Sequence, residues 1–146
     1  MKTVIMAGGK GTRIAEMNSL VPKPMIPIDG RPILEYQIDA LKKQGCQEFI
    51  LIIGHLGHVI QAYFGDGSRL GVDIQYIVEE SPLGTAGALY YLKGKILDDF
   101  LLINGDIIFD VDIPRFLECH KRLKTTATIL THPNSHPYDS GIIIAD

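Results

Sequence analysis

A glycine-rich turn after a short apolar run constrains the fold more than any other feature. The run Val4–Met6 predicts a buried strand, and three glycines follow it within the four positions Gly8–Gly11. Glycine lets backbone N–H groups approach a phosphate closely, and the start of a helix favours negative charge. Arg13 and Lys23 add two positive charges to the same segment. The beginning of the chain therefore predicts a phosphate-binding turn for nucleotide chemistry.

The spacing of these glycines excludes two common phosphate-binding motifs. It is not the G-x-x-x-x-G-K-[ST] of a P-loop, and it lacks the second half of the dinucleotide fingerprint G-x-G-x-x-G. On the glycines alone, a strand-to-helix turn without a ligand remains an alternative. The neighbouring Thr12-Arg13 and Pro22-Lys23-Pro24 favour a turn that binds a ligand.

Composition and charge exclude several classes of function. The 146 residues are 46% hydrophobic with a net charge of −3, which predicts one domain with a core. Lys and Arg are scattered, so no nucleic-acid partner is expected. Cys46 and Cys119 lack metal-ligand spacing and predict reduced thiols in a cytoplasmic protein. No signal peptide opens the chain and no apolar run approaches the ~20 residues that cross a membrane, so no membrane partner is expected.

Short apolar runs alternate with helical segments along the chain. The expected strands are Thr3–Met6, Glu48–Ile53, Asp73–Val78, Phe100–Ile103, Thr126–Thr131 and Gly141–Ala145. The expected helices are a segment opened by Gly30-Arg31-Pro32 and ended by Gly45, then Gly57–Phe64, Thr85–Leu92 and a segment capped by Asp112. Continuous apolar strands between helices predict an α/β sandwich with a largely parallel sheet.

Two longer motifs resemble a known family. Met6–Arg13, followed by Val21–Ile28, is similar to the signature of the sugar-phosphate nucleotidyltransferases, in particular the mannose-1-phosphate and heptose-1-phosphate guanylyltransferases. The resemblance extends over all 146 residues. It implies a Rossmann-like three-layer sandwich of the nucleotide-diphospho-sugar transferase type. Members of that family run on past this length, so residues 1–146 are interpreted as the nucleotide-binding portion of such a domain.

The resemblance also implies a reaction and roles for the first residues. The protein would transfer a nucleoside monophosphate from an NTP to a sugar-1-phosphate, giving an NDP-sugar and pyrophosphate, and a homo-oligomer is compatible with the family. Arg13 would hold the β- and γ-phosphates, and Lys23 would bridge the α-phosphate and the sugar phosphate. The polyphosphate would lie against the backbone of Ala7, Gly8, Gly9, Gly11 and Thr12.

A second cluster follows the third expected strand. By the resemblance, Glu79, Gly84 and Thr85 hold the base of the nucleotide. A carboxylate only accepts hydrogen bonds, and guanine offers two adjacent donors, whereas uracil and thymine offer one donor between two acceptors. Glu79 therefore predicts GTP as the nucleotide. Two alternatives stay open: both glutamates at this strand end are solvated charges, or Glu80 is the inward residue, because neighbours on a strand point to opposite faces.

A third cluster is Asn104-Gly105-Asp106, directly after an apolar strand. Ligands gather at the carboxyl ends of parallel strands, and a carboxylate there can hold Mg²⁺ on phosphate oxygens. The resemblance makes Asp106 the metal ligand and places Gly141 at the sugar. Asp110 is expected to be a loop residue.

Two other classes of function are weighed against the enzyme. A catalytically incomplete domain that binds a nucleotide or nucleotide sugar for regulation is disfavoured because Arg13, Lys23 and Asp106 are all present. A nicotinamide dehydrogenase domain is disfavoured by the spacing of the glycine turn.

Overall fold

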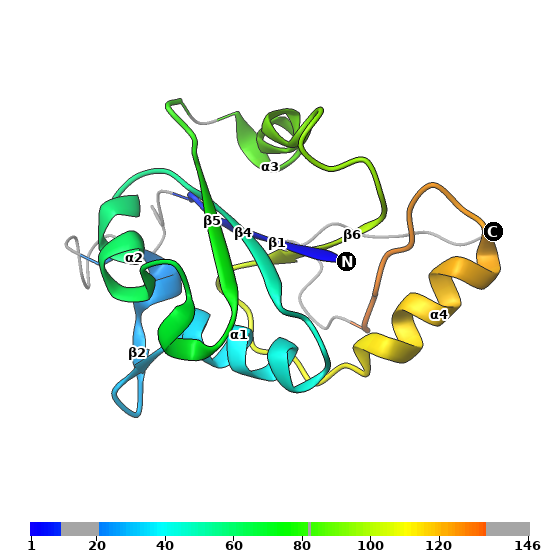
Figure 1. The fold of residues 1–146 in the computed structure, drawn as a ribbon, viewed down its shortest axis with the longest axis horizontal. Helices are drawn as coiled ribbons and strands as arrows, with labels where there is room; N and C mark the ends of the chain where they lie inside the picture. Colours follow the sequence, from blue (N-terminus) through cyan, green and yellow to red (C-terminus); the bar gives the residue numbers. More distant parts are fainter. Residues whose placement is uncertain (10–20, 82, 134–146) are drawn as a thin grey trace. The chain divides into compact units, whose positions relative to one another are not determined.

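The computed structural model describes residues 1–9, 21–81 and 83–133. The chain divides into two compact units, Met1–Ile113 and Pro114–Asp146, and each is described by itself. The first unit contains the sheet and the helices that cover it (Figure 1).

Four parallel strands form the sheet of the first unit. β1 (Lys2–Ala7) lies between β4 (Glu48–Ile53) and β6 (Phe100–Asn104), and β5 (Asp73–Val78) pairs with β4. All three pairings are parallel. These are the first four strands expected from the sequence, to within one residue at each end, and they confirm an α/β fold with a parallel sheet.

The register of the strands brings four strand ends to one edge. Ala7 is paired with Ile53, Ile53 with Val78, and Met6 with Asn104. The chain therefore leaves all four strands at the same edge, where ligands gather in open parallel sheets. The first residues beyond the strands are Gly8, Gly54, Glu79 and Gly105.

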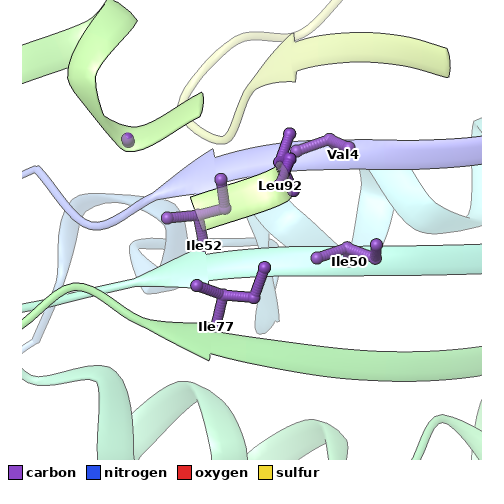
Figure 2. Close-up of a cluster of buried hydrophobic side chains, with 6 residues drawn as sticks. Val4, Ile50, Ile52, Ile77 and Leu92 are labelled. Carbon is purple, nitrogen blue, oxygen red and sulfur yellow. The ribbon is translucent and has the colours of Figure 1, made fainter. Parts of the chain in front are cut away.

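One face of the sheet is covered by α3 (Gly84–Ala88) and the 3-10 turn η3 (Leu89–Leu92). Side chains of three strands meet these helical turns in a buried hydrophobic cluster (Figure 2). The cluster consists of Val4, Ile50, Ile52, Ile77, Ala88 and Leu92. Alternate residues of one strand share a face, which is why Ile50 and Ile52 both belong to it.

The other face is covered by α1 (Ile33–Lys43) and α2 (Gly57–Phe64), on the side away from α3 (Figure 1). The side chain of Ile53 lies against Gly57 at the start of α2. In α1, Leu34, Ile38 and Leu41 are fully buried. Their spacing is that of a helical stripe, as the sequence predicted.

Two helices differ from the helices expected from the sequence. α1 begins at Ile33, because Arg31–Pro32 forms the short strand β3, which pairs with β2 (Pro27–Ile28) in an antiparallel hairpin. The expected helix Thr85–Leu92 is divided into α3 and η3.

The last helix, α4 (Ile113–Leu123), starts directly after Asp112, as expected, and all of it after Ile113 belongs to the second unit. The prediction of a strand at Thr126–Thr131 was wrong. Ile129 and Leu130 are 73% and 59% exposed, and no strand of the described residues pairs with this segment. A strand needs a neighbour for its backbone N–H and C=O groups. The strand expected at Gly141–Ala145 lies outside the described residues.

None of the helices that the structure describes is long and apolar enough to span a membrane.

A cluster of charged and aromatic side chains joins α1 to the segment after α2. The carboxylate of Glu35, only 7% exposed, pairs with Arg31 Nε at 3.0 Å and with Arg69 Nη2 at 3.1 Å. The Arg69 guanidinium also lies over the ring of Tyr63. Burial alone would raise the pKa of Glu35, but hydrogen bonds from Tyr63, Arg69 and Arg31 outweigh burial and hold this pKa below its ordinary value of 4.5.

We expect Glu35→Gln to lower the free energy of unfolding by about 1–3 kcal/mol at neutral pH, because charged hydrogen bonds are lost. The pKa of Glu35 is lower in the folded than in the unfolded protein, so the carboxylate stabilises the fold above pH 4.5, and this contribution is lost as the pH falls through the folded pKa. Urea unfolding should therefore show a difference between variant and wild type that shrinks below pH 4.5. A difference that stays constant down to about pH 3 would contradict this account.

Candidate active site

The strand ends lie very close together because glycines occupy the points of contact. A Cβ atom at Gly54 would lie 2.9 Å from the carbonyl oxygen of Gly8. A Cβ atom at Gly105 would lie 2.9 Å from the carbonyl oxygen of Met6, which also accepts a hydrogen bond from Gly105 N–H at 2.9 Å. Any larger residue would push the backbones apart. The backbones therefore pack closely at this edge of the sheet, with little side-chain bulk between them.

The structure brings two of the predicted site residues into direct contact at this edge. Lys23 begins the 3-10 turn η1 (Lys23–Met25), which is anchored by the buried Pro24 and Met25. Asp106 follows the end of β6. Lys23 Nζ lies 2.6 Å from Asp106 Oδ2, and the two side chains are 38% and 33% exposed. An ammonium group and a carboxylate, both partly exposed, are thus held together at the carboxyl edge of the sheet.

Glu79 lies at the same edge and is directed toward the glycine turn. Its backbone N–H donates to the Ile53 carbonyl oxygen at 2.7 Å, and its Oε1 accepts a hydrogen bond from Leu83 N–H at 2.8 Å. Its Oε2 would lie 3.0 Å from a Cβ atom at Gly8, whereas the neighbouring Glu80 is exposed. Of the two glutamates, Glu79 is therefore the inward one. A carboxylate offers about four acceptor positions, so the bond from Leu83 leaves it able to accept more.

Gln37 also belongs to this edge, and the sequence analysis did not single it out. Gln37 is 2% exposed, and its Nε2 donates hydrogen bonds to the carbonyl oxygens of Asn104 and Ile107. The sequence contained a signal for this residue, because Gln37 lies within the buried helical stripe that includes Leu34 and Ile38. A polar side chain at such a position must find a buried partner.

The structure describes only some of the other predicted site residues. Ala7 ends β1 and is buried, Gly8 is half-buried and Gly9 is exposed. Gly84 and Thr85 form the start of α3. The predicted residues Gly11, Thr12, Arg13 and Gly141 lie outside the described residues.

Asp106 fits the requirements of a magnesium ligand. Within residues 1–9, 21–81 and 83–133, no three His, Cys, Asp or Glu side chains cluster tightly enough to hold a metal alone. Mg²⁺ is usually bound by one or two carboxylates, with substrate phosphates and water completing its shell. Asp106 supplies one partly exposed carboxylate at the phosphate-accessible edge, which matches that ligand set.

Residues 2–146 match the nucleotidyl transferase family. The chain is 36% identical over 144 residues to the mannose-1-phosphate guanylyltransferase of Mycobacterium tuberculosis, which covers 98% of this chain and 40% of that protein. It is 33% identical, over a 160-residue alignment, to a UTP–glucose-1-phosphate uridylyltransferase of Synechocystis, which covers all of this chain and 41% of that protein.

A solved structure shares the fold. HddC from Yersinia pseudotuberculosis, crystallised with GMP-PN, aligns with a TM-score of 0.74 at 33% identity over 82% of this chain and 53% of HddC. The chain thus spans about half the length or less of these three proteins, from 40% to 53%. The family match extends over nearly every residue, and the fold agrees with it. The chain therefore belongs to the nucleotidyl transferase family.

Proposed function

We propose that the protein transfers a nucleoside monophosphate from an NTP, GTP by preference, to a sugar-1-phosphate and releases pyrophosphate. The observation that carries the proposal is the contact of Lys23 with Asp106 at the carboxyl edge of the parallel sheet. This pair supplies a cation for phosphate groups and a carboxylate for a metal ion at one place. The similarity to a guanylyltransferase and a uridylyltransferase supports the same reaction class.

The reaction needs alignment and charge neutralisation more than it needs an acid or a base. An oxygen of the sugar-1-phosphate is already an anion, and it forms a new bond to the α-phosphorus while the bond from that phosphorus to the pyrophosphate oxygen breaks. Fixed positive groups aimed at the phosphates lower the barrier by stabilising the charge that shifts between oxygens. We assign Lys23 to the α-phosphate and the sugar phosphate, and Arg13 to the leaving phosphates. Backbone N–H groups of the turn from Ala7 to Thr12 would hold the polyphosphate.

We assign Asp106 to Mg²⁺, which when bound would supply positive charge to the phosphate oxygens. Lys23 and Asp106 neutralise each other in this structure. The Lys23 ammonium has three N–H donors, so it can add a contact to a phosphate group while it stays paired with the Asp106 carboxylate.

We propose that residues 1–146 form the nucleotide-binding portion of the transferase domain, with Gly141 at the sugar. The three similar proteins described above are about twice as long as this chain or more. We assign Lys23, Glu79 and Asp106, which lie at the carboxyl edge of the sheet, to the nucleotide and its metal ion, and this assignment supports the proposed division.

A screen for pyrophosphate release tests the proposed reaction. GTP, UTP, dTTP and ATP are each mixed with several sugar-1-phosphates and Mg²⁺. We expect release only when both an NTP and a sugar-1-phosphate are present, and most of it with GTP. Binding of GTP without release for any sugar-1-phosphate would favour a regulatory nucleotide-binding domain instead.

We assign the choice of base to Glu79, which lies beside Gly8 in the structure. Guanine presents N1–H and N2–H₂ side by side, so the two oxygens of a carboxylate can accept both. Adenine has no N1–H, and uracil and thymine have one N–H between two acceptors. An acceptor-only side chain therefore favours GTP over the other three nucleotides.

Glu79→Gln should narrow the preference in kcat/KM for GTP over UTP by roughly fivefold to a hundredfold, because a paired hydrogen bond of about 1–3 kcal/mol is lost. Glu80→Gln is the matched control, since Glu80 is the exposed neighbour on the same strand end, and it should keep the wild-type preference. A wild type that uses UTP or dTTP as well as GTP would remove the assignment of guanine, and only the transfer reaction would remain.

A further inference from the structure

We propose that Gln37 is a positioning residue that holds the turn carrying Asp106, and that it thereby sets the affinity of the site for its metal ion. The inference rests on the proposed function for the role of Asp106. The contacts of Gln37 are independent of that function.

The amide of Gln37 holds the chain on both sides of Asp106. Its Nε2 donates one hydrogen bond to the Asn104 carbonyl oxygen at 2.9 Å and a second to the Ile107 carbonyl oxygen. Asn104 is the last residue of β6, and Ile107 directly follows Asp106. The amide nitrogen has two hydrogens, so both are used to tie the two ends of this turn to one side chain.

The side chain that makes these bonds is itself rigidly placed. Gln37 is 2% exposed, and the adjacent Leu34 and Ile38 of the same helical stripe are fully buried. Well-packed side chains of this kind stay in single rotamers. The position of the turn is therefore tied to α1, in addition to the bond from Gly105 N–H to β1 and the ion pair of Asp106 with Lys23.

Packing alone does not account for a glutamine at this position. Burying an amide is unfavourable unless its polar atoms are hydrogen-bonded. Gln37 Oε1 is buried and has no hydrogen-bond partner among the described residues. An apolar residue would continue the stripe without that penalty, so the useful property of Gln37 is its NH₂ group and the turn that this group holds.

The control for the test is a second glutamine, which lies at the end of the same helix. Gln44 follows α1, about two helical turns beyond Gln37, and its Oε1 accepts a hydrogen bond from the backbone N–H of Ile113 at 2.8 Å. Gln44→Met and Gln37→Met are the same substitution, and each removes a hydrogen bond between side chain and distant backbone. Only Gln37→Met affects the turn of Asp106.

The first readout is the Mg²⁺ dependence of pyrophosphate release. In Gln37→Met we expect the Mg²⁺ concentration for half-maximal rate to rise about tenfold, which is typical when a group that orients a metal ligand is lost. At saturating Mg²⁺, the KM for the nucleotide should stay within about twofold of wild type. Gln44→Met should leave the Mg²⁺ curve unchanged even if it lowers the melting temperature as much. An unchanged curve in Gln37→Met, or an equal shift in both variants, would overturn the proposal.

The second readout does not depend on turnover. Amide hydrogen exchange, measured without nucleotide, should be faster in residues 104–107 of Gln37→Met than in wild type and Gln44→Met. Equal exchange in all three would overturn the role of Gln37 in holding the turn. Absence of turnover in the wild type would count against the proposed function, while the exchange result would still decide this role. If Gln37→Met does not fold, Gln37→Leu replaces it, because it also removes both donors and continues the apolar stripe of α1.

Discussion

Replacing Lys23 with alanine should lower kcat/KM roughly thirtyfold to a thousandfold and leave the fold intact. A charge-assisted phosphate contact in a closed site contributes about 2–4 kcal/mol to the transition state, and each ~1.4 kcal/mol is a factor of ten in rate. Lys23 lies where such a contact is needed, at the carboxyl edge of the sheet and against Asp106. The same loss is expected for Arg13→Ala, since Arg13 is assigned to the leaving phosphates.

The loss should come from chemistry and not from unfolding. The ion pair between Lys23 and Asp106 is more than one third exposed on the lysine side, and ion pairs of this kind stabilise a fold by only about 0–1 kcal/mol. Lys43→Ala, at the exposed last residue of α1, is the control and should keep wild-type activity. A loss below about threefold at both Lys23 and Arg13 would contradict a catalytic role for these cations.

Asp106→Asn should lower the rate at limiting Mg²⁺ at least about thirtyfold, because a metal ion contributes several kcal/mol of charge stabilisation in such reactions. The amide keeps the shape of the side chain but removes the negative charge that a hard cation prefers. The turn itself should stay in place, since Gln37 contacts only the backbone on either side of Asp106.

The measurement is the rate of pyrophosphate release over a range of Mg²⁺ concentrations. Asp110→Asn is the matched control, since Asp110 is an exposed carboxylate a few residues further along the same segment. We expect its Mg²⁺ curve to overlay that of the wild type. Normal turnover of Asp106→Asn at low Mg²⁺ would show that the metal ion is held elsewhere.

The sheet could be predicted because short, mostly apolar runs mark its strands. The central strands β1 and β4 are buried along most of their length, whereas β5 and β6 alternate buried and exposed residues. Glu48–Ile53 and Asp73–Val78 are found with the bounds that their apolar runs predicted. Parallel pairing then places all strand ends at one edge. The family resemblance assigned both Lys23 and, through Mg²⁺, Asp106 to the phosphate groups, although the two residues are far apart in sequence. The direct contact between them is a feature of the three-dimensional structure alone.

The predictions that were wrong or incomplete have physical causes that a local sequence pattern does not contain. Thr126–Thr131 has the composition of a strand, but a strand exists only with a partner for its backbone, and no described strand pairs with it. Strand alternation left Glu80 open as an alternative to the predicted Glu79. The closeness of Glu79 Oε2 to Gly8 and the exposure of Glu80 identify Glu79 as the inward residue. A helical stripe is recognised in a sequence by its apolar residues. The polar Gln37 within this stripe was therefore not predicted, although it contacts the site.

The most direct test of the proposed reaction follows the phosphorus atoms of GTP during incubation with a sugar-1-phosphate and Mg²⁺. If the protein transfers a nucleoside monophosphate, label at the α-phosphorus appears in the nucleotide sugar and label at the γ-phosphorus appears in pyrophosphate. Lys23→Ala should slow both by the same factor. Label from the γ-phosphorus in the sugar product, or α-label released as GMP or GDP without sugar, would contradict nucleotidyl transfer.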